Sequence, residues 1–399
     1  MKPFQIKNDI FWIGALHPDL RLFDIIMRTK NGTTYNSYLI RDEKIAIIDT
    51  VKEKFAHQYI SHIKELVDPG KIEYIIAQHT EPDHTGSLTS LLEIAPNAQI
   101  VCAKVAVKYV ENTINREAGI IPVENNSTLS LGTRTLRFLS TPFLHWPDTM
   151  MTYSESDEIL FPCDVFASHF CDSRMFDDTI ARDFRPDFRQ YFEVILRPYK
   201  RHLRNALKKI EPLTIKTIAP SHGPILRKNI ADYINCYKAW AAVKAENKPK
   251  RMLIYYASAH GNTEKMANKI AEGARSVGLE VELFDACTIH PQDHLERIEN
   301  ADALVFGSPT INNDVVKPIW DILTSLATID IKGKVGASFG SVGWSGEAVQ
   351  FLDDRLAAMK VKVPVKGLNA VLVPSEQELA ECYTFGQNVA KGVAMDVKE

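Results

Sequence analysis

The sequence predicts an α/β protein of two domains, because a polar stretch separates two segments in which expected strands and helices follow one another in different order. The chain has 399 residues, and at about 150 residues per domain a single core is not expected. Residues 246–251 read ENKPKR, a charged run with a proline that is typical of a linker. We therefore expect one domain over residues 1–249 and a second over residues 250–399.

The first segment predicts sheets covered by helices, an α/β or α+β sandwich. The expected strands are residues 10–14, 38–40, 45–48, 72–77, 100–103 and 136–139. The turn at residues 41–44 predicts a hairpin between two of them. Helices are expected over residues 87–94 and 192–210.

The second segment repeats strand, loop and helix about five times, which predicts a doubly wound parallel sheet. The expected strands are residues 252–256, 280–284, 303–306, 335–339 and 370–373, with a final helix at 377–394. Most of these apolar runs are nearly continuous, as expected for parallel strands that are buried on both faces.

Composition excludes several classes of protein. The net charge of −3 gives no basic face for a nucleic acid. No apolar run reaches the roughly 18 residues of a membrane span, and the N-terminal residues do not resemble a signal peptide. None of the six cysteines forms a Cys-x-x-Cys pair, so free thiols and a cytoplasmic location are expected.

The stretch HTEPDH at residues 79–84 is the strongest chemical signal in the chain. It places His79, Glu81, Asp83 and His84 directly after an apolar run. Two imidazoles and two carboxylates at this density indicate a bound cation, and mixed nitrogen and oxygen ligands suit zinc, iron or manganese.

Three further candidate ligands follow other expected strands, and they are His145, Asp164 and His222. Each of them alone is more often a structural residue. All seven together are too many for one ion and suit two ions about 3.5–4 Å apart with a bridging carboxylate.

This layout resembles the metallo-β-lactamase fold, an αββα sandwich with two metals at the sheet edges. Hydrolases of that fold usually have a histidine where this chain has Glu81. A carboxylate there favours iron over zinc, and this feature resembles the flavodiiron proteins. The resemblance implies one iron held by His79, Glu81 and His145, and another held by Asp83, His84 and His222, with Asp164 bridging.

Three loops at the ends of expected strands in the second segment predict a ligand site. Their candidate residues are Ser258, Ala259, His260, Gly261, Asn262 and Thr263; Ser308, Pro309, Thr310, Ile311 and Asn312; and Ser341, Gly343, Trp344 and Gly346. The first loop, which opens a helix, suits a phosphate, although a simple helix cap would look similar. Small residues admit a flat ring that Trp344 can cover. The pattern resembles flavodoxin, which implies FMN.

A flavin and two irons suggest electron transfer rather than hydrolysis. The resemblance covers the whole chain and implies an A-type flavodiiron protein that reduces dioxygen to water, nitric oxide to nitrous oxide, or both. It also implies a head-to-tail homodimer or a dimer of such dimers. No Cys-x-x-Cys pair is present, so the expected electron donor is separate, a rubredoxin or a reduced deazaflavin.

Several residues and two rival functions complete the sequence analysis. His169 and Tyr191 are candidates for the gas pocket, although structural roles are as natural for them. Asp49 is expected to orient a metal loop, and Cys163 to serve packing only. The rivals are a di-zinc hydrolase fused to a flavodoxin-type domain, and an electron carrier whose first domain is structural.

Overall fold

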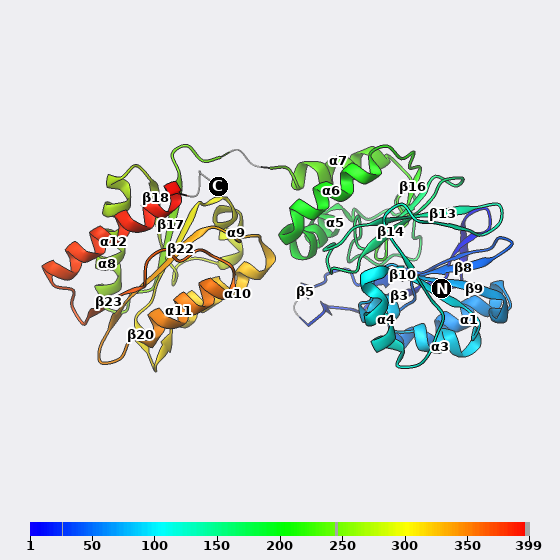
Figure 1. Cartoon of the computed structure of the whole chain (residues 1–399), viewed down its shortest axis with the longest axis horizontal. Coiled ribbons are helices and arrows are strands. Elements are labelled where there is room, and N and C mark those ends of the chain that lie inside the picture. The colour runs from blue at the N-terminus through cyan, green and yellow to red at the C-terminus, as the bar shows by residue number, and fades with distance from the viewer. Residues whose placement is uncertain (26, 244–245, 396–399) are drawn as a thin grey trace. The chain divides into compact units, whose positions relative to one another are not determined.

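The computed structural model describes residues 1–25, 27–243 and 246–395, and the chain divides into two compact units, Met1–Ala242 and Val243–Glu399 (Figure 1). The structure divides the chain after Ala242, which is earlier than the predicted boundary at residue 249. Asn247 accounts for the difference, because its side-chain amide donates to the carbonyl oxygen of Asn300 at 2.6 Å and to the Asp302 carboxylate at 2.9 Å. These bonds attach the linker to the second unit.

Two sheets form the centre of the first unit. The seven-stranded sheet contains, in spatial order, β1 (Phe4–Lys7), β2 (Ile10–Trp12), β7 (Tyr38–Ile40), β8 (Ile45–Ile48), β9 (Ile72–Ala77), β10 (Gln99–Ala103) and β11 (Ile120–Val123). The five-stranded sheet contains β12 (Thr128–Ser130), β13 (Thr135–Ser140), β14 (Met150–Ser154), β15 (Ile159–Phe161) and β16 (Thr217–Ile218). Two short ribbons pair β3 (Ala15–His17) with β6 (Thr33–Tyr35) and β4 (Leu22–Phe23) with β5 (Met27–Arg28).

Helices cover the outer face of each sheet. The first sheet packs against α1 (Ala56–Leu66), α3 (Leu88–Ile94) and α4 (Val107–Ile114), and the second against α5 (Arg185–Tyr191), α6 (Lys200–Ile210) and α7 (Ile230–Trp240). The short helices are α2 (Pro82–Thr85), η1 (Glu53–Phe55), η2 (Pro69–Lys71), η3 (Lys104–Ala106), η4 (Phe192–Leu196) and η5 (Arg197–Tyr199). The unit is therefore the αββα sandwich that the resemblance implies.

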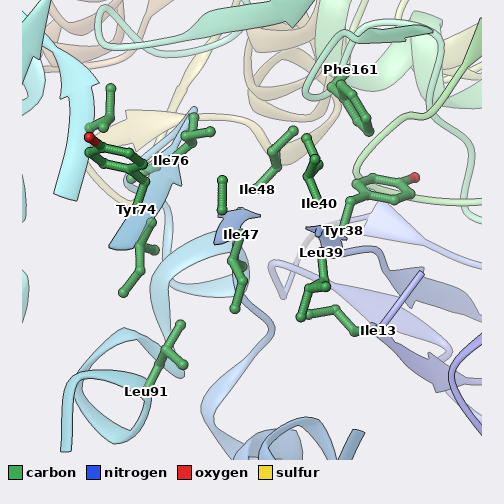
Figure 2. Packing of buried hydrophobic residues seen from close by; sticks show 14 of the residues in the cluster. Ile13, Tyr38, Leu39, Ile40, Ile47, Ile48, Tyr74, Ile76, Leu91 and Phe161 are labelled. Atoms are coloured by element: carbon green, nitrogen blue, oxygen red, sulfur yellow. The ribbon is translucent and has the colours of Figure 1, made fainter. Parts of the chain in front are cut away.

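The alternation of side chains along the strands builds this core (Figure 2). Leu39 and Ile47, which are partners in the antiparallel β7–β8 hairpin, lie on the same side as Leu91 of α3. Ile40 and Ile48 point the other way, toward Phe161 of the second sheet. Successive residues of a strand face opposite sides, so the sheet is buried against both layers.

The predicted helical run over residues 192–210 is confirmed, but it is not one regular α-helix. A wide π-helical turn, η4, and a 3₁₀ turn, η5, precede α6. Pro198 explains the break, because proline lacks the N–H of a helix interior and its ring clashes with the preceding turn.

The second unit is a five-stranded parallel sheet with helices on both faces. Its strands are, in spatial order, β18 (Glu280–Asp285), β17 (Arg251–Tyr256), β19 (Ala303–Gly307), β22 (Val335–Val342) and β23 (Leu368–Val371). One face packs against α8 (Asn262–Ser276) and α12 (Glu376–Met395), and the other against α9 (Pro291–Asn300), α10 (Lys317–Ser325) and α11 (Glu347–Ala358). The small elements are η6 (Leu326–Thr328) and the hairpin of β20 (Thr310–Ile311) and β21 (Asp314–Val315).

The last strand begins and ends two residues earlier than the predicted range of 370–373. Leu372 has a φ of +53°, a left-handed conformation that a strand does not continue through. No helix within the described ranges is both long enough and apolar enough to cross a bilayer.

Helices α8 and α12 approach each other closely through two glycines, so we predict that a side chain at Gly386 destabilises this unit. A Cβ atom there would lie 2.0 Å from the Ile270 carbonyl oxygen, and one at Gly273 would lie 1.9 Å from that of Tyr383. Gly386→Val should lower the free energy of unfolding by about 2 kcal/mol, as overpacking does, in urea unfolding monitored by circular dichroism.

Asn388→Val, two residues along on the exposed face of α12, is the matched control and should change stability by less than about 0.5 kcal/mol. Equal stability of the two variants would contradict the close packing of these helices.

Candidate metal centre and ligand pocket

All seven predicted metal ligands follow strands of the two sheets in the first unit. His79, Glu81, Asp83 and His84 follow β9, His145 follows β13, Asp164 follows β15, and His222 follows β16. Pro82 opens the short helix α2, since its fixed φ suits the first helical position. That turn places Asp83 and His84 on a helix directly after Glu81.

The side chains form two triads. In the first, the Oε2 atom of Glu81 lies 3.1 Å from Nε2 of His79 and 3.0 Å from Nε2 of His145. In the second, Asp83 lies 3.7 Å from Nε2 of His84 and 3.2 Å from Nε2 of His222. Each triad brings ligand atoms within 4.8 Å of one another, which suits one ion per triad.

Asp164 lies between the two triads. Its Oδ1 atom is 3.4 Å from Nε2 of His84 and 3.5 Å from Nε2 of His222, in the second triad. Its Oδ2 atom is 3.7 Å from Nε2 of His145, in the first. One carboxylate thus presents an oxygen to each triad, as a ligand that bridges two ions does.

The cluster has unsatisfied atoms that fit metal ions. Oδ1 of Asp83, Nε2 of His84 and Oδ2 of Asp164 are buried without a hydrogen-bond partner among the described residues. Such atoms are costly in a protein interior, and a cation would satisfy all of them at once. Three carboxylates also nearly balance the charge of two divalent ions.

A second layer of polar groups orients the histidines. The Nδ1 atom of His79 lies 3.2 Å from the Asp148 carboxylate, and that of His84 lies 3.2 Å from Asp49. The backbone carbonyl of Thr34 accepts from Nδ1 of His222 at 2.6 Å. Partners of this kind fix the ring so that Nε2 faces the metal. The role expected for Asp49 therefore has a geometric basis.

Sequence reasoning missed Asp148 and Asp24. Asp148 is fully buried, and its only signal in the sequence is its place two residues before a strand. Asp24 lies far from the motif in sequence, yet burial and a hydrogen bond to Glu81 raise the pKa of Asp24 to about 7. Nothing in the local sequence indicates that contact.

Cys163 is buried, as a packing residue would be, but it lies beyond the end of β15, so the expected strand alternation does not place it. Its Sγ atom lies 4.0 Å from Nδ1 of His84, the ring nitrogen that also faces Asp49. The residue has a φ of +56°, so the regular alternation of a strand does not apply there. Cys163, Asp49 and His84 form a third group of ligand-type atoms.

His169 and Tyr191 both lie beside the second triad. The Tyr191 hydroxyl donates to Oδ1 of Asp164 at 3.0 Å, and its ring centroid is 4.8 Å from that of His169. The Nδ1 atom of His169 pairs with the Thr33 hydroxyl at 3.1 Å, while Nε2 is buried without a partner among the described residues. Burial and the nearby charge of His222 lower the pKa of His169 to about 3, so this ring is neutral.

The second unit has a pocket of about 700 Å³ at the carboxyl ends of its strands. Ten predicted residues line it, and they are Ala259, His260, Asn262, Pro309, Thr310, Ile311, Asn312, Ser341, Gly343 and Trp344. Asn313, Val342 and Leu372, which were not predicted, line it as well. The Trp344 side chain is 92% exposed, so it is not a core residue.

The other five predicted residues, Ser258, Gly261, Thr263, Ser308 and Gly346, are not among the lining residues. The Ser258 hydroxyl accepts from the Glu264 N–H at 3.3 Å, and that of Thr263 pairs with the Ser341 hydroxyl at 2.8 Å. The Ser308 hydroxyl accepts from the Val316 N–H at 3.1 Å. Gly261 and Gly346 precede α8 and α11, so these residues shape the loops.

Known proteins match both units. Residues 33–223 match the family described as ODP family beta lactamase, and residues 254–386 match the flavodoxin family. The chain is 39% identical over 401 residues to flavo-diiron protein FprA2 of Clostridium acetobutylicum, covering 98% of this chain and 100% of the relative. It is 36% identical over 399 residues to a nitric oxide reductase of Moorella thermoacetica, covering 98% and 99%.

Solved structures agree with these relatives. Rubredoxin:oxygen oxidoreductase of Desulfovibrio gigas has a TM-score of 0.70 at 29% identity, with all of both chains covered. The flavodiiron protein of Giardia intestinalis has a TM-score of 0.68 at 30% identity, covering 99% of this chain and 97% of the other.

The fold and the two sites define an oxidoreductase with a β-lactamase-like domain followed by a flavodoxin domain. The chain belongs to the flavodiiron proteins. The hydrolase reading of the first domain is therefore excluded, and the resemblance seen in the sequence is confirmed.

We predict that the metal-free protein loses stability as the pH rises from 6.5 to 9. Burial opposes protonation of His79, but its contacts with Asp148 and Glu81 raise its pKa from 6.5 to about 9. Because the pKa of His79 is higher in the folded state, protonation of His79 stabilises the folded protein fully below pH 6.5. This contribution to the free energy of unfolding is lost as the pH passes 9. Calorimetry of protein treated with a chelator should show a falling melting temperature over this range.

The protein reloaded with metal is the control, because a metal-bound His79 is neutral throughout. Its melting temperature should not show this decline. The same slope in both forms would contradict the assignment of His79 as a ligand.

Proposed function

We propose that this chain reduces dioxygen, nitric oxide or both at a pair of iron ions that receive electrons from FMN. The observation that carries the proposal is the pair of ligand triads sharing Asp164, with Glu81 in the first triad. A carboxylate ligand at this position makes the site harder than an all-histidine one and favours iron.

The triads divide the ligands between the irons. His79, Glu81 and His145 would hold one ion, Asp83, His84 and His222 the other, and Asp164 would bridge them. When bound, reduced FMN supplies two electrons and a ferrous pair supplies two more. Four electrons and four protons convert one dioxygen to two waters, and two of each convert two nitric oxide molecules to nitrous oxide and water.

His169 and Tyr191 are the residues that we propose to face the gas. The unpartnered Nε2 atom of His169 is available for a hydrogen bond to a small ligand. The Tyr191 hydroxyl already donates to Asp164, so it holds the bridging carboxylate in place. Positioned groups of this kind direct protons in a reduction.

FMN would occupy the pocket of the second unit. The loop before α8 would receive its phosphate, because the first N–H groups of a helix favour an anion. The exposed ring of Trp344, which lines the pocket together with Ile311 and Leu372, suits the flat isoalloxazine ring. The glycines beside Trp344 let the backbone approach this ring.

The relatives suggest the partners. One matched structure is named rubredoxin:oxygen oxidoreductase, and a rubredoxin is the donor that we propose, with a reduced deazaflavin as the alternative. We also propose a head-to-tail homodimer, or a dimer of such dimers, that brings the flavin of one subunit to the irons of the other. The cytoplasm is the proposed location.

We predict that His79→Asn abolishes gas reduction and leaves flavin chemistry intact. The variant removes one ligand and the partner of Asp148, so iron content and anaerobic turnover of either gas should fall by at least about 100-fold. The rate of FMN reduction by dithionite should not change, because the flavin site is in the other unit.

His62→Asn is the matched control, since His62 is a buried histidine whose Nδ1 atom pairs with the Ile13 carbonyl at 3.1 Å. It should keep its iron and its turnover. Normal consumption of dioxygen and nitric oxide by His79→Asn would refute the proposed site.

A further inference from the structure

Three polar side chains lead from the surface of the first unit toward the metal ligands. Lys54 in η1 is exposed, His17 at the end of β3 is half-buried, and Tyr35 at the end of β6 is 1% exposed. None of them is a candidate ligand. Their order in depth is the feature that the proposed function leaves unexplained.

The hydrogen bonds between them have a defined direction. Nζ of Lys54 lies 2.8 Å from Nε2 of His17, and Nδ1 of His17 lies 3.3 Å from the Tyr35 hydroxyl. An ammonium group only donates, so Nε2 of a neutral His17 must accept and Nδ1 must carry the hydrogen. The imidazole then donates to the Tyr35 oxygen, which leaves the hydrogen of Tyr35 free to point inward.

The surrounding structure holds these groups in place. β3 and β6 are paired, with Ala15 opposite Tyr35 and His17 opposite Thr33. The Phe55 ring packs 5.3 Å from the His17 ring and 5.5 Å from the Tyr35 ring, measured between centroids. Lys54 also lies over the Phe55 ring, at 4.8 Å from its centroid. The Phe55 ring thus packs beside all three side chains and restricts their movement.

Tyr35 reaches the metal ligands. Its ring meets the ring of His222 edge-on at 5.8 Å, and the neighbouring Thr34 carbonyl accepts from Nδ1 of the same histidine. A neutral phenol has a single O–H group, so it can pass its proton on only by receiving another.

The charges around His17 favour the neutral ring. Burial lowers its pKa, and the nearby cations Lys54 and Lys52 lower it further, while Asp19 opposes them. Burial and the charge of Lys52 also lower the pKa of Lys54, which makes its ammonium group a stronger acid. The other titratable group that faces the His17 ring is Tyr35, at the end of β6.

We propose that Lys54, His17 and Tyr35 form the path by which protons enter the buried metal site. This inference rests on the proposed function, because both reductions consume protons. One dioxygen takes up four electrons and four protons, and two nitric oxide molecules take up two electrons and two protons. The electrons come from reduced flavin, and the path carries protons only.

Each transfer conserves atoms and charge. The Lys54 ammonium gives a proton to Nε2 of His17, the Nδ1 proton moves to the Tyr35 oxygen, and the original Tyr35 proton leaves toward the substrate. Water at the surface reprotonates Lys54. The half-exposed imidazole returns to its first tautomer by exchanging protons with solvent.

The experiment measures turnover of either gas by the iron- and FMN-loaded protein as a function of pH, in H₂O and D₂O. His17→Gln and Tyr35→Phe should lower turnover about tenfold or more, since positioned proton transfer typically contributes at least this much. The loss should grow as the pH rises, and the solvent isotope effect should increase. Lys54→Met should lose only a fewfold, because water can protonate His17 directly.

Iron content and the rate of FMN reduction are the second readout, and both should remain normal in these variants. Tyr153→Phe is the matched control, because this buried hydroxyl donates to the Thr214 carbonyl at 2.7 Å, away from the path. It should retain the pH profile and isotope effect of the parent protein.

The outcomes separate the two proposals. A parent protein that reduces neither gas refutes the proposed function. A parent that reduces a gas, with His17→Gln and Tyr35→Phe showing its pH profile and isotope effect, refutes the path alone. If Tyr35→Phe binds less iron, His17→Gln decides, because His17 contacts no ligand in the described ranges.

Discussion

The burial of ionisable groups at the edge of two sheets is the constraint on which the rest of the first unit depends. His79, Asp83, His84, Asp164 and His222 are all buried, and unpaired carboxylates in such a place are costly. Two bound cations would pair with these carboxylates and imidazoles, so metal binding would be favourable. The strand ends aim the ligands at one place, and Asp49, Asp148 and the Thr34 carbonyl hold the rings so that Nε2 faces inward.

The two units contribute different physical properties. The first encloses its polar cluster, so a gas and protons must enter through defined routes, and the Lys54–His17–Tyr35 path is one that the hydrogen bonds trace. The second has an open pocket with an exposed tryptophan at its wall, which suits a flat ring that must exchange electrons with another molecule. The buried cluster of candidate ligands and the open pocket thus belong to separate folds.

Much of this arrangement could be predicted from the sequence, because it depends on local patterns. The strand at 72–77 and the strand–loop–helix order of the second unit follow from apolar patterns, and the candidate ligands follow from their places after strands. What failed depends on contacts that are distant in sequence or on irregular backbone. Asp24 reaches Glu81 from another segment, and a positive φ turns Cys163 toward His84. Pro198 lies in a 3₁₀ turn where periodicity alone predicts a regular α-helix.

The central claim is a pair of iron ions held by two triads that share Asp164. Anomalous diffraction from crystals of the protein purified with iron and zinc both present tests it most directly. The account predicts two iron peaks per chain, one beside Glu81 and one beside Asp83, with Asp164 between them. A single peak, or zinc at both positions, would contradict it.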